Sequence, residues 1–285
     1  MSIPRWAALF VALALLACSP KPQEAHPALW RVEREQGQVG WLFGTIHSAP
    51  RPLQWRTPGV REALDHSGIV MVEVGNLADE AGVAATFARL AKSQGQPPLS
   101  QRIAPRERTE LAALLKKSGY RDGDFAAMDT WAAALMLARA EEGSGDARNG
   151  VDRAVIAAAA GRPVVELEGA AKQLGLFDNL PEDEQRDLLT AVVTEAVQPD
   201  RDLSASWRKG DMTTLERETR SGMLADPELR EVLFARRNRD WAVRIGEAVK
   251  AGRRPFVAVG AAHMAGPQGL PAMLERQGFR ITRVE

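Results

Sequence analysis

Short apolar runs and longer stretches of helical spacing alternate along this chain. The runs Val39–Phe43, Ile69–Val72 and Phe256–Val259 have the length and composition of buried strands. Between them, apolar residues recur three and four positions apart, which is the pattern of helices with one face in a core. Strands that alternate with helices predict an α/β fold with a mainly parallel central sheet flanked by helices.

The same patterns predict the remaining elements. Leu29–Arg34 alternates apolar and polar residues and is expected to pair with Val39–Phe43 as a hairpin. Further strands are expected at residues 163–167 and 279–284. Helices are expected at residues 83–92, 105–117, 124–140 with Asp124 as N-cap, 151–160, 181–197, 203–209, 212–222, 226–250 and 270–277. A large helical section therefore fills the middle of the chain.

The first residues have the pattern of an export signal. The apolar run Trp6–Ala17 is shorter than the about 20 residues that a membrane span needs. It ends in Leu15-Leu16-Ala17-Cys18, which resembles a bacterial lipoprotein signal in which Cys18 is lipidated. A plain secretory signal with an incidental cysteine is the alternative. We therefore expect a signal peptide at residues 1–18, a proline-containing tether at residues 19–28, and one domain at residues 29–285.

This signal predicts a lipid-anchored protein of the bacterial cell envelope. Ser19 after the cysteine resembles sorting signals for the periplasmic face of the outer membrane. Cys18 is the only cysteine, so neither an internal disulfide nor thiol catalysis is expected in the mature domain. Lys plus Arg and Asp plus Glu both total 37, and no basic block occurs, so nucleic-acid binding is not expected. The oligomeric state is left open.

Two peptides of the same design follow predicted strands near opposite ends of the chain. Gly44-Thr45-Ile46-His47 follows the first strand run, and Gly260-Ala261-Ala262-His263 follows the run Phe256–Val259. Glycine permits a sharp turn where a strand ends, and open α/β sheets bind ligands beyond the carboxyl ends of their strands. We therefore expect His47 and His263 to meet in one crevice, as half a metal site or as an acid–base pair.

Carboxylates occupy similar positions. Glu73 follows the strand run Ile69–Val72, and Glu168 follows the run at residues 163–167. An acid at a strand end can also simply meet solvent or cap a helix. Two histidines and a carboxylate form a common ligand set for catalytic divalent metals, which makes Glu73 the preferred third ligand.

Four other residues are candidates for supporting roles. Arg237 lies on the apolar face of the longest predicted helix, with Asn238 at its edge, and a buried guanidinium needs an anionic partner. A fixed internal ion pair is the alternative to a role at the site. Asp152-Arg153 begins a helix after Gly150, where an acid also has an ordinary electrostatic explanation.

Several stretches together resemble the TraB/GumN family, which is related to the Tiki membrane metalloproteases. The resemblance covers residues 29–285 and rests on Leu29-Trp30-Arg31-Val32, Leu42–His47, Gly150–Arg153, Leu167-Glu168 with Gln173, Trp207 with Gly210-Asp211, Arg237–Trp241, and Phe256–His263 with Gly266-Pro267 and Gly269-Leu270. It implies a fold similar to the erythromycin-esterase-like and ChaN-like group. In the Tiki branch, the matching histidines and a strand-end glutamate are implicated in metal-dependent peptide cleavage, which here implies His47, His263 and Glu73.

The leading hypothesis is a metal-dependent hydrolase that acts on peptides or proteins. His47, Glu73 and His263 would bind Mn, Co, Zn or Fe and activate a water molecule. Arg237 or Arg153 would stabilise an oxyanion or hold a substrate carboxylate, and Glu168 or Asp152 would orient a ligand histidine. The alternatives are a non-catalytic binding protein for a peptide, a polysaccharide-related ligand or haem, and a scaffold whose motifs only preserve the fold.

Overall fold

The computed structural model describes residues 21–285, except residue 78 and the segments 142–144 and 199–202. The predicted signal peptide and Cys18 lie outside the described residues. The segment predicted to be an extended tether belongs to the folded domain from Gln23 onward. Gln23–Glu24 (β1) pairs in parallel with Leu53–Gln54 (β4). Ala25 and Ala28 are buried as well, so this part of the predicted tether is packed onto the domain.

A six-stranded sheet organises the domain and has the order β6-β5-β7-β3-β2-β8. Neighbouring strands from β6 to β3 run parallel, while β2 lies antiparallel to both β3 and β8. The expected mainly parallel sheet and the expected hairpin are therefore confirmed. The strands are Leu29–Glu33 (β2), Val39–Thr45 (β3), Ile69–Val72 (β5), Val164–Glu166 (β6), Pro255–Gly260 (β7) and Arg280–Arg283 (β8).

Both faces of this sheet are covered, which explains the continuous apolar strand runs. Successive side chains of a strand point to opposite faces, so Val70 and Val72 enter one core while Ile69 and Met71 enter the other. Helices α2, α6, α9 and α10 cover the first face, and α12 and α13 cover the second. The bounds are Pro58–His66 (α2), Val151–Ala157 (α6), Leu203–Arg208 (α9), Met212–Glu218 (α10), Arg236–Lys250 (α12) and Leu270–Arg276 (α13).

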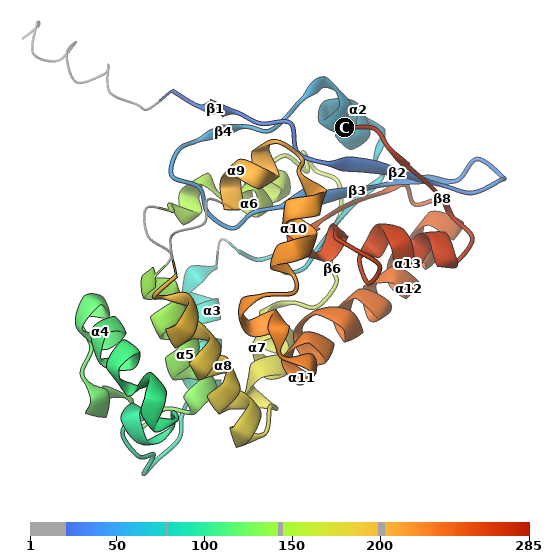
Figure 1. The fold of residues 1–285 in the computed structure, drawn as a ribbon. Coiled ribbons are helices and arrows are strands. Elements are labelled where there is room, and N and C mark those ends of the chain that lie inside the picture. Colours follow the sequence, from blue (N-terminus) through green and yellow to red (C-terminus); the bar gives the residue numbers. More distant parts are fainter. Residues whose placement is uncertain (1–20, 78, 142–144, 199–202) are drawn as a thin grey trace, which may run out of the picture.

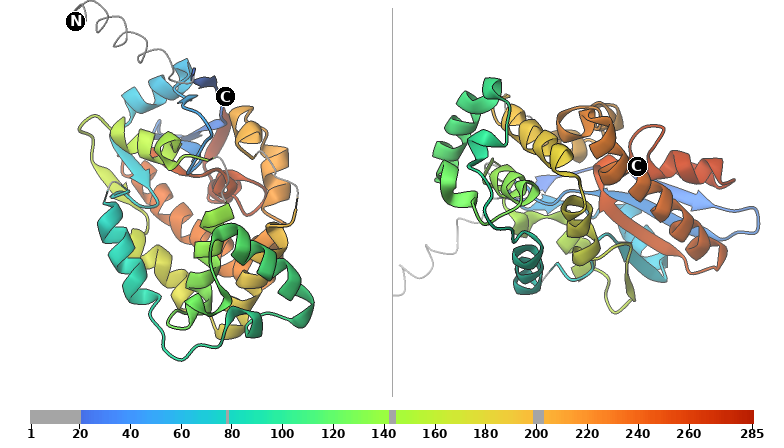
Figure 2. Two further views of the ribbon diagram at one scale, coloured as in Figure 1. Left: turned by 90° about the vertical axis from the view of Figure 1, so that its left-hand side faces the viewer. Right: turned by 90° about the horizontal axis from the view of Figure 1, so that it is seen from below.

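The helical section predicted in the middle of the chain has a core of its own. Trp131 is fully buried in it, among leucine, valine and phenylalanine side chains of the surrounding helices. These helices gather at the end of the molecule away from α2 and the paired strands β1 and β4 (Figures 1 and 2). They are Glu80–Leu90 (α3), Arg108–Ser118 (α4), Thr130–Glu141 (α5), Ala170–Asp178 (α7), Glu182–Glu195 (α8) and Pro227–Arg230 (α11).

Two helix predictions were wrong in detail. The helix expected to begin at Asp124 is divided, because Asp122–Phe125 forms a short 3-10 turn and α5 begins only at Thr130. The longest predicted helix contains a π-helical segment, Glu231–Ala235, between α11 and α12. Residue spacing alone cannot detect either interruption, since each keeps an approximately helical periodicity.

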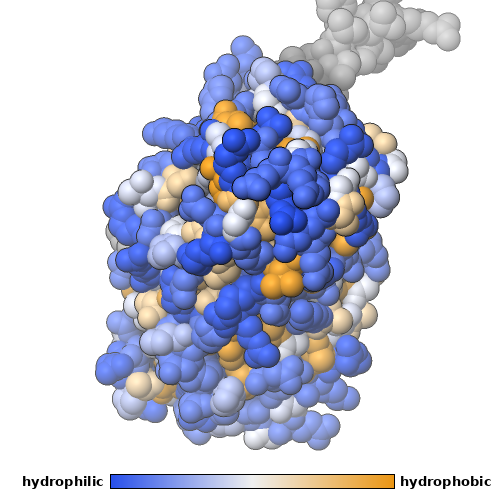
Figure 3. All heavy atoms as spheres, turned by 90° about the vertical axis from the view of Figure 1, so that its right-hand side faces the viewer, coloured by the Kyte–Doolittle hydropathy of each residue, from blue (hydrophilic) through white to orange (hydrophobic). Residues whose placement is uncertain are grey.

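The surface is mainly polar. On the face drawn in Figure 3, hydrophobic residues are scattered among hydrophilic ones instead of forming one large patch. Among the described residues, no helix combines the length and the apolar character that a bilayer span requires.

Candidate functional site

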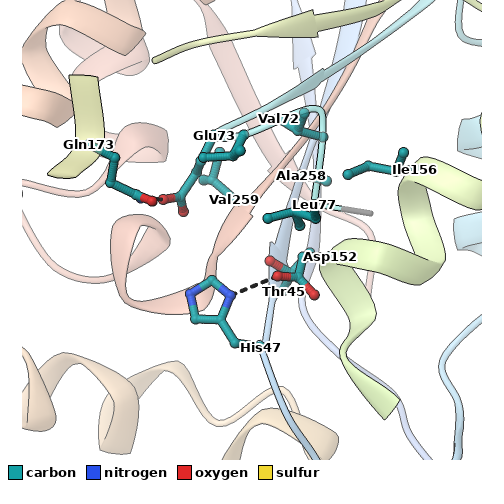
Figure 4. A pocket seen from close by; sticks show the side chains of 11 residues that line it. Thr45, His47, Val72, Glu73, Leu77, Asp152, Ile156, Gln173, Ala258 and Val259 are labelled. Atoms are coloured by element: carbon teal, nitrogen blue, oxygen red, sulfur yellow. Dashed lines mark hydrogen bonds and ion pairs between the residues drawn. The ribbon is translucent and has the colours of Figure 1, made fainter. Parts of the chain in front are cut away.

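Three parallel strands bring the predicted site residues to one edge of the sheet. Strands β3, β5 and β7 run in the same direction, and His47, Glu73 and His263 each follow the carboxyl end of one of them. A small cleft opens at this edge. It is lined by Thr45, His47, Val72, Glu73, Val74, Leu77, Asp152, Ile156, Gln173, Ala258 and Val259 (Figure 4).

His47 and Asp152 form a hydrogen-bonded pair in this cleft. His47 Nδ1 lies 2.8 Å from Asp152 Oδ2, and the imidazole side chain is 70% exposed while the carboxylate is 15% exposed. A carboxylate only accepts hydrogen bonds, so Nδ1 carries the proton and the lone pair resides on Nε2. In Figure 4 the second ring nitrogen faces the side of the cleft that holds Glu73 and Gln173. Of the predicted supporting acids, Asp152 is the one that orients a histidine.

The pair is positioned by close contact between the end of β3 and the start of α6. The Val151 N–H donates to the Ile46 carbonyl at 2.8 Å, which places Asp152 in the first turn of α6 beside His47. A Cβ at Gly150 would lie 2.4 Å from the His47 carbonyl oxygen. Glycine is therefore required at this position for the two segments to approach.

Glu73 is a buried carboxylate whose two oxygens are both hydrogen-bonded. Oε1 accepts from the Gly260 N–H at 2.7 Å, and Oε2 accepts from Gln173 Nε2 at 3.0 Å and Arg237 Nη2 at 2.8 Å. Burial opposes the ionised form of this group. The attraction of His263, which is charged only at the low pH where Glu73 titrates, acts together with the charge of Arg237 and the Gly260 hydrogen bond. These outweigh burial and lower the pKa of Glu73 to about 2.

His263 is buried and neutral. Its ring lies 5.3 Å from the Phe234 ring and 4.6 Å from the Trp241 ring, measured between centroids. Asn238 Nδ2 donates to the Gln268 carbonyl at 2.7 Å, so its Oδ1 faces His263 Nδ1, 2.6 Å away, and accepts from it. Burial lowers the pKa of His263 to about 3, although the charge of Glu73 acts in the opposite direction.

Arg237 connects these groups. Its guanidinium donates to both oxygens of Glu168 at 2.9–3.2 Å, and Nη1 donates to the Leu233 carbonyl at 3.0 Å. Nη1 also lies 3.2 Å from His263 Nε2. Glu168, one of the two acids expected to orient a ligand histidine, is thus the partner of Arg237 instead, and its side chain is 1% exposed.

The π-helical segment explains how Arg237 reaches this position. In it the Arg236 N–H bonds to the Glu231 carbonyl, five residues back, which widens the helix. The Leu233 carbonyl within the segment accepts from the Arg237 side chain, and Phe234 packs on His263. The segment therefore directs an arginine and an aromatic ring toward the site.

The glycines of the paired motifs serve close packing. A Cβ at Gly44 would lie 2.9 Å from the Ala261 Cα, so the first glycine lets the two motif segments touch. A Cβ at Gly260 would lie 3.3 Å from Glu73 Oε1, whose partner is the Gly260 N–H. The repeated design in the sequence thus reflects contact between the motifs.

Three further residues, Arg153, Gln173 and Thr45, have contacts or positions that the sequence did not predict. Arg153 pairs with Glu80 at 3.2 Å and does not line the cleft. Gln173, which had no predicted role, contacts Glu73 from α7; only the family resemblance had included it. The Thr45 hydroxyl lines the cleft in a residue that is 2% exposed, and it has no hydrogen-bond partner among the described residues.

The predicted metal ligands do not fit a divalent cation in this arrangement. Among the described residues, the only three ligand atoms of histidine, cysteine or acidic side chains within 4.8 Å of one another belong to Glu184, Asp187 and Asp226, elsewhere in the fold. His47 and Glu73 line the cleft but His263 does not, so the two motif histidines do not share it as expected. The Glu73 oxygens and both nitrogens of His263 already have hydrogen-bond partners, one of which is a guanidinium. We therefore derive no catalytic step through a metal.

Comparison with known proteins identifies the family. The model of the TraB/PrgY/gumN family matches residues 28–283. The uncharacterized protein YbaP of Escherichia coli (strain K12) is 28% identical over 245 residues, which cover 82% of this chain and 86% of that protein. YbaP of Shigella flexneri matches to the same extent. No solved structure matches the chain. The family match over almost the whole domain confirms the resemblance found in the sequence, and the chain belongs to the TraB/PrgY/gumN family.

Proposed function

We propose that the chain is a hydrolase that cleaves a carbonyl substrate, with peptides as the expected class, and that His47 is its general base. The observation that carries this proposal is the His47–Asp152 pair, 2.8 Å apart, at the mouth of a cleft beyond the sheet. An imidazole oriented by a carboxylate is a common arrangement for proton transfer near neutral pH.

The proposed reaction needs only water and the substrate. His47 Nε2 takes a proton from a water molecule as its oxygen bonds to the carbonyl carbon, which gives a tetrahedral oxyanion. The oxyanion collapses, the bond to the leaving nitrogen breaks, and the imidazolium returns its proton to that nitrogen. The products are a carboxylic acid and an amine.

Two other features support a substrate site in this cleft. The Thr45 hydroxyl is buried at its wall without a protein partner among the described residues, so it is available to donate to a substrate oxygen. Apolar side chains of Val74, Leu77 and Ile156 line the same space and suit an uncharged substrate group. The negative charge of Glu73 and Asp152 disfavours an anionic group there.

The test is cleavage of a peptide library by the protein lacking residues 1–18, with products read by mass spectrometry. His47→Ala is expected to lower kcat/KM by about 10²–10⁴-fold, the usual contribution of a general base. His66→Ala is the matched control, because this exposed histidine makes a local bond, to the Glu62 carbonyl, and lies outside the cleft. Equal cleavage by wild type and His47→Ala would refute the proposal, and peptide binding without turnover would favour the non-catalytic alternative.

We further propose that the protein is lipid-anchored through Cys18 in the cell envelope, on the periplasmic face of the outer membrane. The support is the lipoprotein-like sequence Leu15–Cys18 followed by Ser19. Labelled palmitate should enter the wild-type protein and not Cys18→Ala, and the wild type should fractionate with outer membranes. Incorporation of label into Cys18→Ala would contradict this assignment.

A further inference from the structure

A fixed positive charge already lies among the residues that a metal would need. The guanidinium of Arg237 contacts Glu73 Oε2 at 2.8 Å and His263 Nε2 at 3.2 Å. These two atoms belong to residues that follow different strands, and each is an atom that a divalent cation would bind. One side chain therefore bridges the glutamate and the histidine.

Neighbours use the ring lone pair of His263 and three of the about four lone-pair sites of the Glu73 carboxylate. Asn238 fixes the His263 tautomer with the proton on Nδ1, so the single ring lone pair is on Nε2 and faces Arg237. Arginine remains protonated in proteins, so its N–H group is necessarily the donor in that contact. On Glu73, the Gly260 N–H takes one oxygen, while Gln173 and Arg237 share the other.

Residues other than Glu73 and His263 also fix the position of Arg237. Glu168 accepts from it through both oxygens, the Leu233 carbonyl accepts from Nη1, and the guanidinium carbon lies 4.6 Å from the Trp241 ring centroid. Its side chain is 11% exposed. Moving the guanidinium away would leave the buried carboxylate of Glu168 without its charged partner. If the guanidinium stays, its positive charge repels a divalent cation placed next to it.

We propose that Arg237 occupies the position of a metal in this chain, so that a permanent arginine cation lies between Glu73 and His263 beside the cleft and the chemistry there proceeds without a bound metal. The inference concerns the same cleft as the proposed function, but it does not require turnover. Arg237 acts here as a positioning residue that holds Glu73 and His263 in place.

Metal binding by the intact mature protein tests this inference. The protein is incubated separately with Mn²⁺, Co²⁺ and Zn²⁺, passed through a desalting column, and analysed for metal by mass spectrometry. We expect less than about 0.1 equivalent on the wild type, and no change in Tm between chelator-treated and metal-incubated samples. We expect Arg237→Gln, which frees the two lone pairs, to gain affinity for Co²⁺ with a visible absorption band. Arg239→Gln is the matched control, because Arg239 is exposed and pairs with Glu231 on the same helix.

The metal-binding results distinguish a failure of this inference from a failure of the proposed hydrolase. About one equivalent of metal on the wild type that is lost in His263→Ala and Glu73→Gln would overturn the inference, whether or not peptides are cleaved. Metal that is unaffected by those substitutions and lost in Glu184→Gln belongs to the acidic group of Glu184, Asp187 and Asp226, and the inference stands. A folded Arg237→Gln that gains no Co²⁺ would also overturn it, because the guanidinium would then not be what occupies the lone pairs. A protein that binds no metal and cleaves no peptide refutes only the proposed hydrolase.

Discussion

At the scale of residues, the two motif histidines are not equivalent. His47 is exposed and paired with a carboxylate, whereas His263 is buried between aromatic rings and paired with an amide. A carboxylate partner stabilises the imidazolium that a general base forms, while burial and a nearby guanidinium oppose it. The local chemistry therefore favours His47 over His263 for the proposed proton transfer.

Asp152→Asn should reveal the orienting role of the carboxylate. The substitution keeps the size of the side chain but removes the charge that stabilises the His47 imidazolium, so kcat should fall at least about 10-fold with little change in KM, as part of the about 10²–10⁴-fold contribution of general-base catalysis. Steady-state peptide cleavage measures both constants. Asp65→Asn, at an exposed residue with a 3.7 Å ion pair, should behave as wild type. An unchanged kcat in Asp152→Asn would exclude the proposed pair.

At the scale of elements, the site depends on two irregular segments. The π-helical segment before α12 turns Arg237 and Phe234 toward His263, and the start of α6 brings Asp152 to the end of β3. Both are held by backbone contacts that a regular helix or a bulkier residue would not permit. Irregular helical turns of this kind are frequent at functional sites.

Gly150→Ala should displace α6 from the end of β3. The added methyl would lie 2.4 Å from the His47 carbonyl oxygen and 2.7 Å from Asp152 Oδ1, so backbone must shift. Overpacking of this kind costs about 1–3 kcal/mol in the free energy of unfolding, measurable by urea titration, and peptide cleavage should fall with it. Gly123→Ala is the control, since its Cβ would meet nothing within 4 Å, and it should change stability by less than about 0.5 kcal/mol. Equal effects of the two substitutions would contradict the close approach.

At the scale of the whole molecule, the buried charge network links stability to pH. The folded pKa of His263, about 3, lies below its ordinary 6.5, so below pH 6.5 the unfolded chain binds a proton that the folded protein does not. The folded pKa of Glu73, about 2, lies below 4.5, which adds a second such proton below pH 4.5. Both shifts make acid destabilise the fold.

The free energy of unfolding should therefore decline as the pH is lowered. Between pH 6.5 and 4.5, His263 should contribute about 1.4 kcal/mol per pH unit, the value for one proton. Urea unfolding at several pH values measures the slope, and comparison with His263→Gln removes the contribution of the other histidines. The variant should show a shallower slope by about that amount. Parallel slopes would mean that His263 titrates alike in the folded and unfolded protein.

The local pattern of apolar residues was sufficient to predict the strands and the edge of the sheet at which the site lies. The apolar runs at 39–43, 69–72 and 256–259 each became a parallel strand, because a strand buried on both faces needs apolar residues at every position. His47, Glu73 and His263 follow the carboxyl ends of these strands at one edge of the sheet, as expected from their positions in the sequence, although His263 does not line the cleft. The division of the helix at Asp124 and the π-helical segment escaped detection, since interruptions of one turn barely change the helical period.

The sequence by itself determined the α/β fold, the family and the strand-end residues, because these depend on local periodicity and short motifs. Only the tertiary structure decided which of those residues pair. Asp152 comes to His47 across 105 positions and Arg237 to Glu73 across 164, and spacing contains no information about such contacts. The partner of each charge decides its chemistry, since a buried carboxylate bonded to a guanidinium is no longer available to a metal.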